Sequence, residues 1–149
     1  MQRRRFFQRV IALTTAVIAS LIRFRVGNAA ENPINPEFTK HFQQAYADQI
    51  ITDSPEILIN LPTNAENGAV VPITIQSQLD NIDSVYIWAE KNPTPLVAEF
   101  ELAKDVAIHI TARIKLAESS HVIVIARQGQ QLLRNLQWVN VMQGGCGTG

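Results

Sequence analysis

The residue with the clearest chemical potential is Cys146, the only cysteine in this chain of 149 residues. It lies in the closing segment Gly-Gly-Cys-Gly-Thr-Gly, between Gly144 and Gly145 on one side and Gly147 on the other. Glycine accepts many backbone conformations at low steric cost and has no side chain to pack. We therefore expect residues 144–149 to form a flexible tail with an accessible thiol. The pattern is typical of a reactive group on a tether rather than of a cysteine in a core.

A thiol in this position needs help to react as a nucleophile. An unperturbed cysteine has a pKa of about 8.5, and the basic residue nearest to Cys146 in the sequence is Arg134. Catalysis by Cys146 itself would need a base and an oxyanion site, which a mobile tail cannot preorganise. We therefore expect a partner enzyme to activate the thiol and to treat this segment as a substrate, and we do not expect Cys146 itself to catalyse a reaction. Four residues beyond Met142, the thiol would reach roughly 13 Å from the domain.

Metal binding by Cys146 together with histidines is an alternative. His41, His109 and His121 show none of the close spacings that zinc ligands have. His109 and His121 also fit solvent-facing positions on strands. The sequence therefore predicts no metal site.

The amino-terminal segment has the organisation of an export signal. Residues 3–7 read Arg-Arg-Arg-Phe-Phe, an apolar run follows at 10–22, and small residues then suit cleavage between about Ala29 and Ala30. This order is typical of a secretory signal peptide, here residues 1–29. The apolar run of 13 residues is shorter than the roughly 20 of a membrane-spanning helix, so no stable membrane anchor is expected.

The arginines suggest which export route is used. Arg3 and Arg4, followed by Phe6 and Phe7, resemble the twin-arginine signal. The alternative is an ordinary secretory signal that happens to contain three arginines. Either route delivers the protein outside the cytoplasm, in bacteria most simply to the periplasm, and we favour the twin-arginine route.

Removal of the signal changes the charge balance. Six of the 13 basic residues precede Ala30, whereas all 13 acidic residues follow it, so the mature chain carries 7 basic residues and a formal net charge of −6. A mildly acidic domain without a basic stripe is a poor nucleic-acid binder.

Residues 30–143 suffice for one domain of ordinary size. A single cysteine in an oxidising compartment indicates a free thiol or an intermolecular disulfide.

The elements that must position the tail follow from hydrophobic periodicity. A helix is expected over residues 36–49. Its apolar face consists of Phe38, Phe42, Ala45 and Tyr46. From Glu56 onward the period changes to two, and strands are expected at residues 57–61, 71–75, 85–89, 96–102, 106–116, 122–126 and 131–142. Turn segments such as Asn64–Gly68 separate them, so we expect an immunoglobulin-like antiparallel β-sandwich with a short amino-terminal helix.

One strand breaks the alternation. Residues 122–126 are apolar on both faces, which is typical of a central strand covered on both sides. Alternatively, one face is exposed in the monomer and covered by a partner subunit. Tyr86 and Trp88 fall on the outward side of a neighbouring strand, either as part of that interface or partly buried under loops.

Two internal segments and the tail together carry a family resemblance. Residues 62–72 contain Ala-Glu-Asn-Gly ahead of a Val-Pro strand, and residues 90–95 contain a Lys-Asn-Pro turn. With the export signal, the helix, the sandwich and the Gly-Gly-Cys-Gly tail, these segments resemble the SoxY family, the sulfur-carrier subunits of bacterial thiosulfate oxidation. The family tail usually reads Gly-Gly-Cys-Gly-Gly, so Thr148 replaces the last glycine.

The resemblance implies a carrier without a separate cofactor. Cys146 would receive thiosulfate as an S-thiosulfonate and present the bound sulfur intermediates to SoxAX-, SoxB- and SoxCD-like enzymes that oxidise and hydrolyse them. It also implies a heterodimer with a SoxZ-like subunit, which lacks a signal of its own and is exported with its partner. The alternative function is an exported β-sandwich interaction module that uses Cys146 for an intermolecular disulfide.

Overall fold

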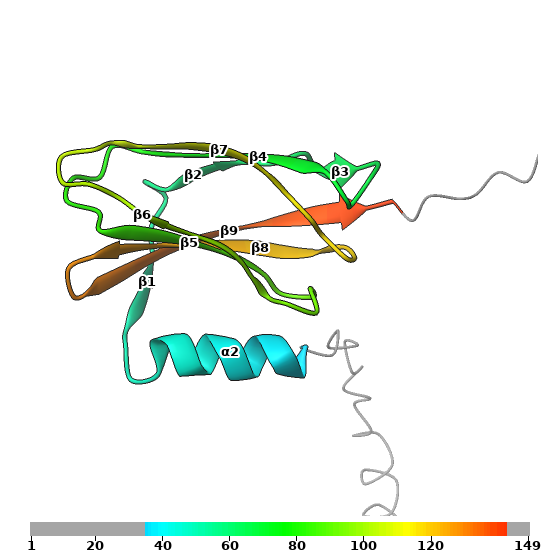
Figure 1. Ribbon diagram of the computed structural model, residues 1–149, viewed down its shortest axis with the longest axis horizontal. Coiled ribbons are helices and arrows are strands. Elements are labelled where there is room, and N and C mark those ends of the chain that lie inside the picture. Colours follow the sequence, from blue (N-terminus) through cyan, green and yellow to red (C-terminus); the bar gives the residue numbers. More distant parts are fainter. Residues whose placement is uncertain (1–34, 143–149) are drawn as a thin grey trace, which may run out of the picture. The chain divides into compact units, whose positions relative to one another are not determined.

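The structure is a computed structural model that describes residues 35–142. The predicted signal peptide at 1–29 and the predicted tail at 144–149 lie outside the described residues, so both stay predictions. Two stacked sheets and one helix make up the described part (Figure 1). The immunoglobulin-like sandwich expected from the periodicity is confirmed.

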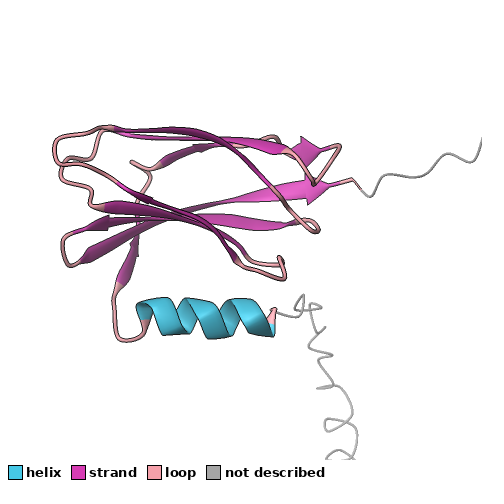
Figure 2. Ribbon diagram, viewed as in Figure 1, coloured by secondary structure: helices cyan, strands magenta, loops and turns pink. Residues whose placement is uncertain are grey.

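The larger sheet has six strands. Five lie in the order β1 (Ile51–Asp53), β9 (Gln131–Val141), β8 (Ser120–Gln128), β5 (Ser84–Ala89) and β6 (Leu96–Glu101). The sixth, β3 (Asn64–Ala65), also pairs with β9. The smaller sheet contains β2 (Leu58–Asn60), β4 (Val71–Ser77) and β7 (Ile108–Ile114), in that order. Figure 2 shows the helix α2 (Pro36–Tyr46) along the larger sheet, on the side away from the smaller one.

The strands that the periodicity predicted are present with shifted ends, and two more were missed. β1 and β3 have three and two residues, too few to show a period, and both pair with β9 in parallel. The segment expected as a turn at 64–68 therefore begins with a strand. The strand expected at 106–116 is shorter, and Val106 is exposed beyond its end.

The helix is also shorter than predicted. It ends at Tyr46 because Ala47 already has a non-helical ψ of 134°, and Asp48 then adopts a left-handed conformation with a φ of 64°. Ala45 is exposed, so its assignment to the apolar face was wrong. At the start, the Asn35 side chain accepts a hydrogen bond from the Glu37 backbone N–H at 3.0 Å, and Pro36 occupies the first turn, both favourable helix-start features. Among residues 35–142, no helix is long and apolar enough to span a membrane.

The core between the two sheets is aliphatic. Alternate residues of each strand point inward, as a half-buried strand requires. The side chains with no exposed surface here are Ile57, Val71, Ile75, Val85, Ile87, Ala89, Val122, Val124, Ala126 and Val139. The residues that alternate with these buried side chains along each strand therefore face away from the inner core.

The opposite face of the larger sheet carries a second, aromatic core under α2. Phe42 lies 4.9 Å from Tyr46 and 5.3 Å from Trp88 between ring centroids. The Trp88 indole N–H donates to the Tyr46 hydroxyl at 3.0 Å, and Trp88 is only 2% exposed. Ile123 and Ile125 of β8 are buried in the same cluster. β8 is thus a central strand covered on both faces, and the cover over Trp88 is the chain's own helix rather than loops or a partner subunit.

Candidate functional site

The predicted site residues lie outside the described part of the chain. Cys146 and the glycines Gly144, Gly145 and Gly147 all follow Met142, the last described residue. The structure therefore shows the root of the tail, where β9 ends. Figure 1 shows that β9 finishes at one end of the larger sheet, beside β3.

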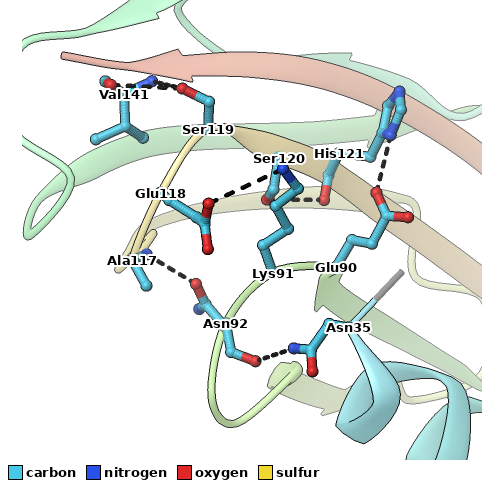
Figure 3. Close-up of polar contacts among 10 residues, drawn as sticks. All are labelled: Asn35, Glu90, Lys91, Asn92, Ala117, Glu118, Ser119, Ser120, His121 and Val141. Carbon is cyan, nitrogen blue, oxygen red and sulfur yellow. Dashed lines mark hydrogen bonds and ion pairs between the residues drawn. The ribbon is translucent and has the colours of Figure 1, made fainter. Parts of the chain in front are cut away.

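Both edges of β9 are hydrogen-bonded up to its last residues. On one side, the Asn140 backbone N–H donates to the Thr63 carbonyl, and the Met142 backbone N–H donates to the Ala65 carbonyl, each at 2.9 Å. On the other side, the Val141 backbone N–H donates to the Ser119 hydroxyl at 2.8 Å (Figure 3). A strand held on two sides cannot fray without losing several hydrogen bonds. The point from which the tail departs is accordingly fixed.

Gly68 allows a close approach behind this root. A Cβ atom at this position would collide with the Leu116 carbonyl oxygen and lie 2.8 Å from Cγ1 of Val141. The Gly68 carbonyl also accepts a hydrogen bond from the Leu116 N–H at 2.7 Å. The Ala-Glu-Asn-Gly segment therefore packs against the last strand. Sequence reasoning saw only a turn here, because the contact joins residues distant in the chain.

The Lys-Asn-Pro turn joins three parts of the fold through Asn92, which is 8% exposed. Its side-chain amide donates to the Lys115 carbonyl at 2.7 Å and its side-chain oxygen accepts from the Ala117 N–H at 2.8 Å. Its backbone carbonyl accepts from the Asn35 side chain at 2.9 Å, which ties the start of α2 to this turn (Figure 3). Asn92 is a buried polar group with its hydrogen bonds satisfied.

A small cluster of charged and aromatic side chains lies near the root. Glu90 and His121 are hydrogen-bonded at 3.0 Å. The His121 and Trp138 rings pack in a T-shaped arrangement, with 4.9 Å between their centroids. Lys91 lies 3.9 Å from a Glu118 carboxylate oxygen and 5.8 Å from the Trp138 ring centroid. Figure 3 shows the His121–Glu90 hydrogen bond beside the Lys91–Glu118 ion pair. The Lys91 ammonium is thus already paired with a carboxylate and is not free to bind an anionic ligand.

The three histidines do not come together. His41 lies on α2 beside Glu37, His109 pairs with Gln76 on the smaller sheet, and His121 belongs to the cluster just described. His109 is exposed, and the side chain of His121 is 42% exposed. Within residues 35–142, no group of three potential ligands lies close enough to hold a metal ion.

Fold and root define a class: a small β-sandwich that presents a cysteine-bearing carboxyl-terminal segment from a firmly held strand. Comparison with known families agrees, because the sequence model described as "Sulfur oxidation protein SoxY" matches residues 42–146. The match covers more than two thirds of the chain and includes Cys146. The chain belongs to the SoxY family of sulfur oxidation proteins.

Solved structures point the same way. The chain is similar to the sulfur carrier protein SoxY from Chlorobium limicola f thiosulfatophilum, with 25% sequence identity and a TM-score of 0.64. The similarity covers 71% of this chain and 96% of that chain. A comparison with curated proteins gave no match. The family match and the structural match support a sulfur-carrier role in sulfur oxidation.

Proposed function

We propose that this protein is a periplasmic carrier that holds thiosulfate-derived sulfur covalently on Cys146 and presents it to the enzymes of thiosulfate oxidation. The observation that carries the proposal is the family match through Cys146, which lies five residues beyond the end of β9, a strand that is hydrogen-bonded on both edges. A fixed root and a short glycine-rich segment suit a thiol that must enter enzyme clefts. The domain itself stays outside.

The chemistry of loading and release can be written as a balanced sequence. The Cys146 thiolate and thiosulfate form one S–S bond and give an S-thiosulfonate, and the two electrons released pass to an oxidising partner enzyme. Water then attacks the terminal sulfonate sulfur in a hydrolytic partner enzyme, which releases sulfate and two protons and leaves a persulfide on Cys146. Cys146 remains bonded to sulfur between these steps. We assign loading to a SoxAX-like partner and hydrolysis to a SoxB-like partner. A SoxCD-like partner then oxidises the outer persulfide sulfur to a sulfonate, with three water molecules as the source of oxygen and with six protons and six electrons released, and a second hydrolysis releases sulfate and returns the free thiol.

The same proposal includes the assembly and the location. The carrier forms a heterodimer with a SoxZ-like subunit and is exported by the twin-arginine route, which transports folded proteins. Arg3, Arg4, Phe6 and Phe7 support this route. Replacement of Arg3 and Arg4 by Lys should leave the carrier and its co-exported subunit in the cytoplasm, as cell fractionation would show.

Cys146→Ser tests the carrier role. We expect it to abolish thiosulfate-dependent turnover in the reconstituted system, because a hydroxyl forms an alkoxide far less readily than a thiol forms a thiolate. The melting temperature should stay that of the parent, because both cores are built from residues before Met142. Retained turnover would disprove the carrier role. The intact mass of the protein, measured without reductant, distinguishes the carrier from the disulfide alternative. Added sulfur on Cys146 supports the carrier, whereas a second chain bonded to Cys146 supports the alternative.

Added bulk beside the thiol tests entry into a cleft. Gly145→Val and Gly147→Val together should slow enzymatic loading at least tenfold, because β-branched residues thicken and stiffen the segment. Alkylation of Cys146 by a small reagent should stay within a few-fold of the parent. An equal decrease in both rates would mean that the glycines serve intrinsic thiol reactivity, and the cleft-entry model would be wrong.

A further inference from the structure

The outer face of the larger sheet has a covered part and an uncovered part. α2 covers Trp88, Ile123 and Ile125, but among residues 35–142 no helix lies over the outward side chains further along β9. We call these side chains, together with their neighbour on β8, the root strip. Its members are His121, Leu136, Trp138, Asn140 and Met142. Leu136 is 43% exposed and Met142 is 58% exposed, so the strip is an uncovered apolar and aromatic surface.

The strip is ordered before anything binds to it. The Trp138 indole N–H donates to the Asn140 side-chain oxygen at 2.7 Å, and the His121 ring lies against the Trp138 ring. The Lys91 ammonium also lies over the Trp138 ring, 5.8 Å from its centroid. A held aromatic side chain loses little conformational entropy on association, and such side chains are frequent interface anchors.

The length of the segment beyond Met142 decides what must cover the strip. Cys146 is four residues further, so in an extended chain its Cα atom lies roughly 13 Å from that of Met142. If an enzyme cleft encloses the thiol, the segment from Met142 to Cys146 lies almost entirely inside that cleft. The rim of the cleft must then touch the surface around Met142. Trp138 is four residues back along the strand, again about 13 Å away at the rise of a β-strand. Leu136 is six residues back, about 20 Å away. An interface of ordinary size, with about 800 Å² per partner, is roughly 30 Å across, so a rim that meets Met142 can cover the whole root strip.

We infer that the root strip is the docking surface for the cleft rim of the enzymes that load and unload Cys146. The inference rests on the proposed carrier function. The charged neighbours Glu90, Lys91 and Glu118 are already engaged in pairs, so the strip fits an apolar rim with hydrogen-bonding groups at its margin. A permanently bound SoxZ-like subunit on the same surface would obstruct every cleft, so that subunit binds elsewhere.

Leu136→Glu is the sharpest test, because the side chain is exposed and the change should not disturb the cores. The matched control is Leu58→Glu, since Leu58 is 58% exposed on the smaller sheet. The full carrier, with its SoxZ-like subunit, is titrated against the SoxAX-like loading enzyme and thiosulfate. We expect Leu136→Glu to raise the KM for the carrier about tenfold with little change in kcat. Leu58→Glu should match the parent.

Two further readouts identify the cause of any change. Alkylation of Cys146 by a small reagent should be equal in the parent and both variants, and so should the affinity for the SoxZ-like subunit. Equal KM values in Leu136→Glu and Leu58→Glu would overturn the docking surface and leave the carrier function intact. Weaker subunit binding by Leu136→Glu, with unchanged KM in the assembled complex, would assign the strip to the subunit and also overturn it. A parent protein that is not loaded at all would instead refute the proposed function.

Discussion

The two faces of the larger sheet are covered in different ways. The inner face packs against a second sheet and is lined by aliphatic side chains such as Ile87 and Val124, with no exposed surface. The outer face packs against an 11-residue helix through the rings of Phe42, Tyr46 and Trp88. A sheet can cover another along its whole length, whereas a short helix covers only part. The difference explains why one face is closed and the other ends in an open strip beside the tail.

The inner face should dominate stability, and Ile87→Ala tests this with the largest expected effect. Truncation of a fully buried isoleucine typically costs about 2–5 kcal/mol of the free energy of unfolding. Chemical denaturation should show this loss, while the exposed Leu58→Ala should change it by less than about 0.5 kcal/mol. A similar result for the two variants would mean that the sheets are not closely packed against each other.

The outer face should contribute less, because its helix is only partly buried. Phe42→Ala should cost about 1–3 kcal/mol, below the range for a fully buried phenylalanine. Hydrogen exchange should accelerate in α2 and leave the amides of β4 and β7 at parent rates, since local stability differs between parts of a fold. Uniform acceleration across both sheets would show that the two cores unfold as one unit.

Alkaline pH should weaken the outer face through Tyr46. Burial raises the pKa of Tyr46 to about 12, although the hydrogen bond from Trp88 acts to lower it. An unfolded tyrosine has a pKa of about 10, so above that pH the unfolded state releases its proton first. The stabilising contribution is complete below about pH 10 and is lost as the pH rises toward 12. Melting temperatures between pH 9 and 12 should decline in the parent.

Tyr46→Phe provides the control for this pH dependence. The variant keeps the ring but leaves the Trp88 indole N–H without its acceptor, which should cost about 1–3 kcal/mol at neutral pH. Its stability should change less than that of the parent between pH 10 and 12. An equally steep decline in both proteins would assign the titration to other groups.

The same contrast explains what sequence reasoning could and could not foresee. Alternating apolar residues revealed the main strands, because burial on one face enforces a period of two. β1 and β3 were missed because parallel pairing with β9, and not a local pattern, makes them strands. Trp88 was recognised as outward-facing, but its cover is a helix about 45 residues earlier, which no local signal encodes.

The candidate site, too, has one part that could be predicted from the sequence and another that could not. Cys146 was identifiable from its position among glycines, and the family match includes it. Its placement lies outside the described residues, so its role still depends on the proposed experiments. The contacts of Gly68 and Asn92 that hold the root came only from the structure, since each joins segments that are distant in the chain.

The hydrogen bonds that hold the last residues of β9 also set an effective concentration. With the root fixed at Met142, the thiol is confined to a radius of roughly 13 Å around that point. If three residues of β9 detached, the radius would grow by about 10 Å, and the accessible volume would increase roughly fivefold. The local concentration of thiol at a docked cleft would decrease by the same factor. Ser119, Thr63 and Ala65 thus keep Cys146 concentrated where an enzyme can use it.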